Sequence, residues 1–159
     1  KVFGMKLLYN ETISMLNTTP LYNGNISSII WNKDGDSQKS AYVYDYDDVS
    51  RITGADYHVS SGGNWVDIDN YDVAITEYTD NGNIRYLSRK NDNGLLMDDL
   101  VYTYSGNQLL GVEDNAPTIG GFNDGNPIGE DFEYDRAGNM TLDRNKSLRF
   151  DYNYLNNIS

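Results

Sequence analysis

Carboxylates are the residues of this sequence with the most obvious capacity for chemistry, since 24 of its 159 residues are Asp or Glu. Pairs such as Asp47-Asp48 and Asp98-Asp99 have the residue type that glycoside hydrolysis uses. That reaction needs two carboxyl groups that face each other across a cleft at a set separation. Neighbouring strand residues point to opposite faces, so such a pair cannot converge on one bond. We interpret these carboxylates as surface and turn residues.

The spacing of several oxygen-bearing side chains also raises the possibility of a calcium-binding loop. Asn32, Asp34 and Asp36 place oxygen ligands at alternate positions around Gly35, as EF-hand loops do. Such a loop needs a bidentate glutamate at its twelfth position, which Val43 occupies here. We interpret the segment as a polar turn between two strands, keep Asp34 and Asp36 as candidate ligands, and expect no metal or other cofactor.

Nucleophilic catalysis has little support in the residue inventory. His58 is the only histidine, and no serine-based triad can be assembled around it from the sequence. The chain has no cysteine, which excludes a disulfide framework, a thiolate metal site and a cysteine nucleophile. We therefore expect that the chain is not an enzyme by itself.

Trp65 is the candidate for contact with a ligand. It follows the turn-forming run Ser60-Ser61-Gly62-Gly63-Asn64, and near exposed tyrosines its ring could stack on a sugar. Burial in a core is the alternative that we favour for it. Trp31 follows Ile29 and Ile30 in an apolar strand and reads as a core residue.

The formal net charge of −12 limits the classes of partner. A phosphate backbone or an anionic membrane surface would be repelled, so we expect neither nucleic-acid binding nor membrane attachment. The longest apolar runs span only a few residues, which is too short for insertion into a bilayer.

A repeat anchored on tyrosine organises the chain and positions these residues. An alternating aromatic strand ends in Tyr-Asp or Tyr-polar, a few turn residues follow, and an aliphatic residue opens a second strand. The clearest copy runs from Phe132 to Met140, with Tyr134-Asp135 and Gly138-Asn139. The anchoring tyrosines and the turn glycines are Tyr22, Tyr46, Tyr78, Tyr104, Tyr134, Tyr152, Gly24, Gly82, Gly106 and Gly138.

The chemistry of one repeat predicts a hairpin. The turn needs a residue at positive φ, which glycine supplies without steric cost and asparagine tolerates. The aspartate after the tyrosine can accept backbone N–H groups within the turn. A single hairpin is marginally stable in water, so successive hairpins must bury their aromatic faces on one another. We predict an all-β fold of tandem antiparallel hairpins in a curved sheet, one block over residues 1–159, with an irregular lead-in over 1–20.

These repeats resemble the YD repeats of RHS (rearrangement hotspot) proteins. The family pattern is Tyr-Asp, two or three residues, Gly-Asn, then Leu or Ile, which Tyr134-Asp135 and Gly138-Asn139-Met140 meet closely. Tyr46-Asp47 with Ile52 meets it with the glycine replaced. The opening residues, from Phe3 to Trp31, are similar to the region upstream of the core domain in RHS proteins of the Bacteroidetes type.

The resemblance implies a structural role in a bacterial protein that is secreted or displayed at the cell surface. RHS repeats wind into a hollow β-shell that encloses a C-terminal toxin or effector, so the expected partners are the rest of the same chain and that cargo. The family's downstream self-cleavage motif is absent from this sequence, so no catalytic residue is carried over. The alternative function is a carbohydrate-binding or adhesion module at a cell surface. Open sheet edges predict an edge-paired homodimer of this segment.

Overall fold

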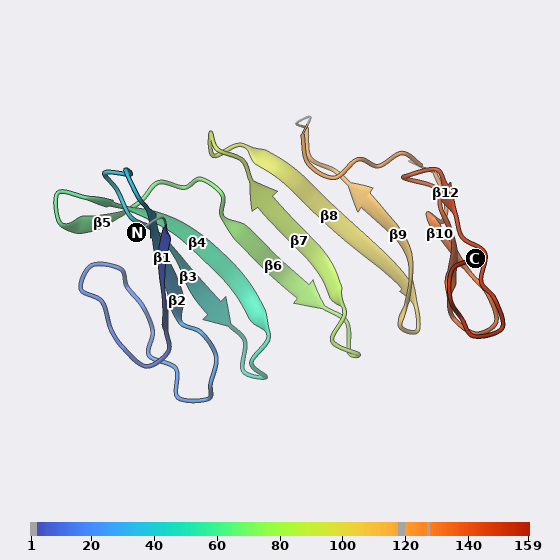
Figure 1. The fold of residues 1–159 in the computed structure, drawn as a ribbon, viewed down its shortest axis with the longest axis horizontal. Coiled ribbons are helices and arrows are strands. Elements are labelled where there is room, and N and C mark those ends of the chain that lie inside the picture. Colours follow the sequence, from blue (N-terminus) through green and yellow to red (C-terminus); the bar gives the residue numbers. More distant parts are fainter. Residues whose placement is uncertain (1–2, 118–119, 127) are drawn as a thin grey trace. The chain divides into compact units, whose positions relative to one another are not determined.

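The computed structural model describes residues 3–117, 120–126 and 128–159, and that part of the chain is built from antiparallel strands without a helix (Figure 1). The predicted all-β fold is confirmed. The strands are β1 (Phe3–Leu8), β2 (Ser28–Lys33), β3 (Ser40–Tyr46), β4 (Ile52–Ser61), β5 (Asn64–Asp67), β6 (Val73–Tyr78), β7 (Ile84–Lys90), β8 (Leu96–Ser105), β9 (Gln108–Asp114), β10 (Phe132–Tyr134), β11 (Met140–Asp143) and β12 (Leu148–Arg149).

Most strands that follow one another in sequence are also neighbours in a sheet; the exceptions are β5 and β6, which both pair with β4, and β9 and β10, which belong to different sheets. The larger sheet has the order β1-β2-β3-β4-β6-β7-β8-β9, with β5 paired to β4, and the smaller sheet has the order β10-β11-β12. Antiparallel neighbours can be joined by tight turns, whereas parallel neighbours need long crossovers. The topology is therefore a run of hairpins, as the repeat pattern predicted.

The chain divides into two compact units, where we expected one block of repeats. The first unit contains Lys1–Ile75 and Arg89–Leu96, and the second contains Thr76–Ser88 and Met97–Ser159. The described residues form no helix long and apolar enough to cross a membrane.

The structure corrects the expectation of an irregular lead-in. Residues 1–2 lie outside the described residues, but Phe3–Leu8 forms strand β1, which pairs with β2 along its whole length. Apolar residues occur on both faces of this strand, with Met5 60% exposed and Leu8 1% exposed, so the sequence lacks a clean alternation of apolar and polar residues. The loop that follows β1 is irregular, and it contributes the fully buried Leu16.

The core of the first unit lies on one face of its strands. Ile30 is opposite Ala41 in the pairing of β2 with β3, so their side chains share a face. Leu16 comes down on this face from the loop and packs with Ala41 and Val43. The loop therefore supplies the cover that a half-exposed antiparallel sheet needs for a dry core.

The second unit has its own core. Leu100 of β8, Val112 of β9 and Phe132 of β10 are buried together, and Phe122 packs against them from the loop between β9 and β10. The two cores are small, which fits a chain whose strands are short and whose aromatic rings stay partly exposed.

Candidate functional site

One five-residue turn recurs through both units. In each copy the first residue donates its backbone N–H to the carbonyl of the fifth, at 2.8–2.9 Å, and the fourth residue has a positive φ. The side-chain oxygen of the first residue accepts one or two backbone N–H groups of the same turn. The copies are Asp47–Arg51, Thr79–Asn83, Asn91–Leu95, Asp135–Asn139 and Asn153–Asn157.

Turn chemistry explains the residue choices at the first and fourth positions. Asp, Asn and Thr can each cap a turn with a side-chain oxygen. The fourth position is Gly82, Gly94 or Gly138 in three copies, and Ser50 and Asn156 adopt the same positive φ in the others. The expected roles of the aspartate and the glycine within the Asp135–Asn139 turn are confirmed.

The anchoring tyrosines tie each repeat to the one before it. The Tyr46 hydroxyl donates to the carbonyl of Ile26 at 2.8 Å, and the Tyr104 hydroxyl donates to Ile84 at 2.8 Å. Tyr134 and Tyr152 do the same to Leu109 and Met140, both at 2.9 Å. Each acceptor is an apolar residue at or near the start of the preceding return strand: Ile84 and Met140 open β7 and β11, Leu109 is the second residue of β9, and Ile26 lies two residues before β2. The hydroxyl therefore ties adjacent hairpins together.

A β-bulge directly precedes Tyr46, Tyr104 and Tyr134 and sets the direction of their side chains. The register shifts between Asp45 and Tyr46 on β3, between Thr103 and Tyr104 on β8, and between Glu133 and Tyr134 on β10. A bulge changes the direction of the next side chain and increases the local twist. Placing it directly before the tyrosine brings the phenol over the neighbouring hairpin.

Tyr78 and Tyr22 are the other two predicted anchors. Tyr78 ends β6 and precedes the Thr79–Asn83 turn. Tyr22 lies outside the strands and is 82% exposed, although Ile26 of its repeat still accepts the Tyr46 hydroxyl. Gly24 has a φ of 91° in that segment, and Gly106 has a φ of 60° in the two-residue turn between β8 and β9.

Burial changes the acidity of the anchoring phenols. Desolvation raises the pKa of Tyr46 and of Tyr134, and desolvation followed by repulsion from Tyr102 raises that of Tyr104. A phenol with a raised pKa stays protonated and keeps donating. The three hydroxyls therefore remain hydrogen-bond donors at neutral pH.

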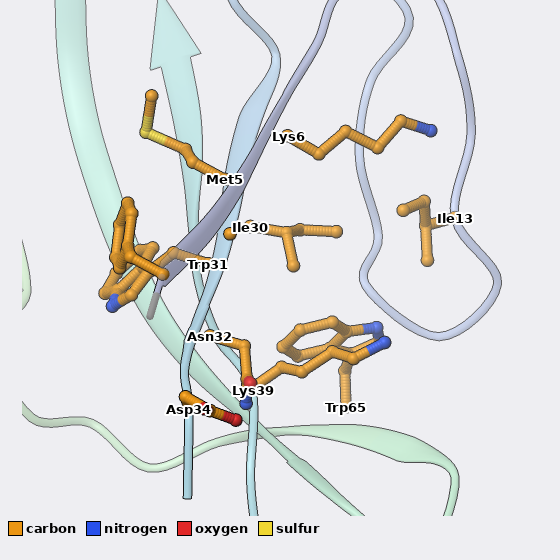
Figure 2. A pocket seen from close by; sticks show the side chains of 11 residues that line it. Met5, Lys6, Ile13, Ile30, Trp31, Asn32, Asp34, Lys39 and Trp65 are labelled. Atoms are coloured by element: carbon orange, nitrogen blue, oxygen red, sulfur yellow. The ribbon is translucent and has the colours of Figure 1, made fainter. Parts of the chain in front are cut away.

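A cavity of about 570 Å³ lies on the core face of the first unit, between β1, β2 and β5. Trp65 of β5 and Ile30 of β2 provide apolar walls, Ile13 approaches from the loop, and Lys6 and Lys39 lie at the rim (Figure 2). This volume is within the usual range for small-molecule sites, which combine apolar walls with a few polar groups.

The structure separates the candidate ligands of the sequence. Asp34 lines this cavity with Trp65, whereas Asp36 is exposed in the same turn and donates its backbone N–H to Lys33. Trp65 is half-buried and packs beside Leu16, Ala41 and Val43, so its expected burial in a core holds for part of the ring only. Among the described residues, no group of three or more His, Asp or Glu side chains converges on one point.

An aromatic strip covers the opposite face of the same strands. Trp31, Tyr42 and Tyr57 have ring centroids 5.4–6.0 Å apart, and Tyr71 meets Tyr57 edge to face at 5.3 Å. Trp31 thus points to the opposite face of β2 from Ile30, although it also lines part of the cavity. Desolvation and then repulsion from Tyr57 raise the pKa of Tyr42, so the Tyr42 hydroxyl stays protonated at neutral pH.

The acidic loop over residues 113–131 is attached to the second unit through two buried carboxylates. Residues 118–119 and 127 of this segment lie outside the described residues. The interpretation of Asp98 as a surface or turn residue is wrong, because Asp98 is fully buried on β8, where it accepts the backbone N–H of Phe122 at 2.5 Å. Asp131, 2% exposed, accepts the N–H of Val112 at 2.6 Å. The segment that begins at Phe122 and ends at Asp131 is therefore fixed to the strands at both ends, by Asp98 and by Asp131.

Sequence reasoning missed the Asn91–Leu95 turn and the lysines of the cavity. The turn was detectable, because Asn91-Asp92-Asn93-Gly94-Leu95 has the capping residue and the glycine at the right spacing, but no tyrosine precedes it. Lys6 and Lys39 carry no such signal. They line the same cavity as Trp65 only because β1 pairs with β2 and β4 pairs with β5.

Comparisons with known proteins identify no family for this chain. No family model, no curated protein and no solved structure matches the chain significantly. The likeness to RHS repeats therefore rests on the tyrosine-anchored turns themselves.

Proposed function

We propose that this chain is a structural segment of an exported RHS-type protein, in which tandem hairpins form part of the wall of a β-shell around a C-terminal toxin or effector. The role is mechanical: each hairpin covers the aromatic face of its neighbour and fixes its position. Its partners are the rest of the RHS chain and the enclosed cargo.

The hydroxyl bond between consecutive repeats is the observation that carries this proposal. Tyr46, Tyr104, Tyr134 and Tyr152 make it at 2.8–2.9 Å, each to a residue at or near the start of the preceding return strand. A device that acts only between neighbours can be repeated indefinitely, which is what a wall built from repeats requires. A catalytic domain would instead concentrate its unusual geometry at one place.

The experiment measures how fast a protease cleaves the C-terminal cargo in the natural full-length protein that contains this segment. Electron microscopy should show a hollow particle, and the C-terminal domain should resist proteolysis until the shell is opened. Replacing Tyr46, Tyr104 and Tyr134 together by Phe should accelerate cleavage of the cargo, because three ties between hairpins are lost.

The matched control replaces three exposed tyrosines by Phe, namely Tyr9, Tyr22 and Tyr154, which are 41%, 82% and 92% exposed. This variant removes the same number of hydroxyls and should protect the cargo as the wild type does. The shell role would be refuted if the natural full-length protein ended with this segment. It would also be refuted if the C-terminal domain were cleaved as fast within the full protein as alone.

A further inference from the structure

The register of the first unit brings Lys39 and Trp65 together at the cavity. Lys39 exchanges hydrogen bonds with Ser60, whose N–H donates to the Lys39 carbonyl at 2.8 Å and whose hydroxyl accepts the Lys39 N–H at 2.7 Å. Ser60 in turn is paired with Trp65. Because the serine between them is small, the lysine stem and the indole can meet above it, and Figure 2 shows the two side chains running alongside each other.

Small residues also account for the hollow. Gly4 is opposite Asn32 in the pairing of β1 with β2, so no side chain from this part of β1 fills the space in front of Asn32. Ile13 and Ile30 close the far side. The result is an apolar recess with one flat aromatic wall.

Two donors at this recess are unused by the described residues. The Lys39 ammonium and the Trp65 indole N–H have no hydrogen-bond or ion-pair partner among residues 3–117, 120–126 and 128–159. Lys6 is different, because its ammonium lies 2.6 Å from the Glu11 carboxylate and is neutralised by it. The Asn32 amide donates to the Gln38 carbonyl at 2.9 Å, which leaves its own oxygen to accept.

We propose that this cavity binds a neutral pyranose saccharide. The C–H face of a pyranose can pack on the electron-rich face of the indole, while its hydroxyls accept from Lys39 and the indole N–H and donate to Asn32. A purely apolar ligand would leave these polar groups unpaired, at a cost in free energy. A polyanion would meet a chain of net charge −12 and one unpaired lysine.

Binding here is independent of the shell role, since either function can fail without the other. The test is NMR titration of the ¹⁵N-labelled chain with cellotetraose, chitotetraose and tetragalacturonic acid. The chain has only two tryptophans, so only two indole N–H signals arise. A neutral saccharide should shift the signal that is missing from Trp65→Phe, in a saturable manner.

Lys39→Met is the decisive variant, because it keeps the methylene stem on the indole and removes the charge. A hydrogen bond from a charged group contributes enough that affinity should fall roughly tenfold. Val66→Ala is the matched control, because Val66 is next to Trp65 on the opposite face of β5, and it should bind as the wild type does.

Several results would overturn the proposal. The first is that neither indole signal moves with any of the saccharides. The second is that the Trp31 signal moves while the Trp65 signal does not, which would show that the Trp65 indole is not the surface on which the saccharide packs. The third is that tetragalacturonic acid binds and neither neutral saccharide does, or that Lys39→Met binds with unchanged affinity.

Discussion

A phenol hydroxyl placed against a backbone carbonyl is the residue-scale device of this protein. It satisfies a carbonyl at the start of each return strand, where the sheet ladder is interrupted by a turn and a bulge. Leaving such a group without a partner costs more than a simple lost contact, because the group has already been removed from water.

Tyr134→Phe tests this device at one position. The Leu109 carbonyl would lose its partner at 2.9 Å, and we expect the free energy of unfolding to fall by about 1 kcal/mol in urea titrations. Tyr154→Phe removes a hydroxyl from a ring that is 92% exposed and should leave stability unchanged. Equal effects of the two substitutions would show that the bond between repeats contributes nothing.

Alkaline titration tests the same hydroxyls without changing the covalent structure of the wild type. Desolvation raises the pKa of Tyr46 and Tyr134 above the usual 10.0. Above that value the unfolded chain loses phenol protons that the folded chain keeps, so the free energy of unfolding falls as pH rises. Below it the contribution is fully present. Urea titrations over this range should show a steeper loss for the wild type than for a variant with Phe at Tyr46, Tyr104 and Tyr134.

The residue types of the repeats were predictable because each role is local. A capping oxygen and a residue at positive φ must lie three positions apart, and the sequence shows this spacing directly, as in Asp135 and Gly138. The hydroxyl bond was not predictable, because it joins Tyr134 to Leu109, and the separation differs from one repeat to the next. The number of residues between two hairpins does not determine their distance in space.

At the scale of elements, the fourth turn position should accept glycine better than serine. Ser50 has a φ of 66° and Gly138 has a φ of 88° in equivalent turns. A left-handed conformation costs a residue with a Cβ roughly 1 kcal/mol. We expect Ser50→Gly to raise the free energy of unfolding and Gly138→Ser to lower it, each by up to about 1 kcal/mol in urea titrations. Changes of the same sign in both variants would contradict this explanation.

The attachment of the acidic loop depends on a glycine at a close approach. A Cβ at Gly121 would lie 2.1 Å from the Asp98 carboxylate and 2.5 Å from the Met97 carbonyl. Gly121→Ala should therefore displace the loop from β8 and expose the Phe122 amide, which hydrogen exchange would detect as lost protection. Gly54→Ala is the control, since its Cβ would meet only ordinary contacts at 3.6 Å or more.

The elements that escaped prediction share a physical cause. The alternation in Phe3–Leu8 is obscured because β1 carries apolar side chains on both faces, and the loop of residues 113–131 is rich in turn residues yet buries Phe122. In both cases tertiary contacts, rather than local propensity, decide the structure. The cavity has the same origin, because its walls come from four segments that only the strand register brings together.

At the scale of the whole molecule, an edge strand and a large net charge act in opposite directions. Among the described residues β1 has a neighbour on one side only, and Met5 and Leu7 are 60% and 38% exposed. Such an edge can pair with a second copy of the chain. The net charge of −12 opposes association, and this repulsion is screened by salt.

We therefore expect the isolated chain to be monomeric at low ionic strength and to form edge-paired dimers as salt is added, as measured by sedimentation velocity. Replacing Met5 and Leu7 by Lys should abolish the dimer, because charges on an edge strand block pairing. These substitutions reduce the net negative charge, so greater repulsion between copies cannot explain a loss of dimer. Val49→Lys, at a turn residue that is 68% exposed, changes the charge in the same direction and should still dimerise. A monomer at every salt concentration, or a dimer that survives both β1 substitutions, would rule out pairing through this edge.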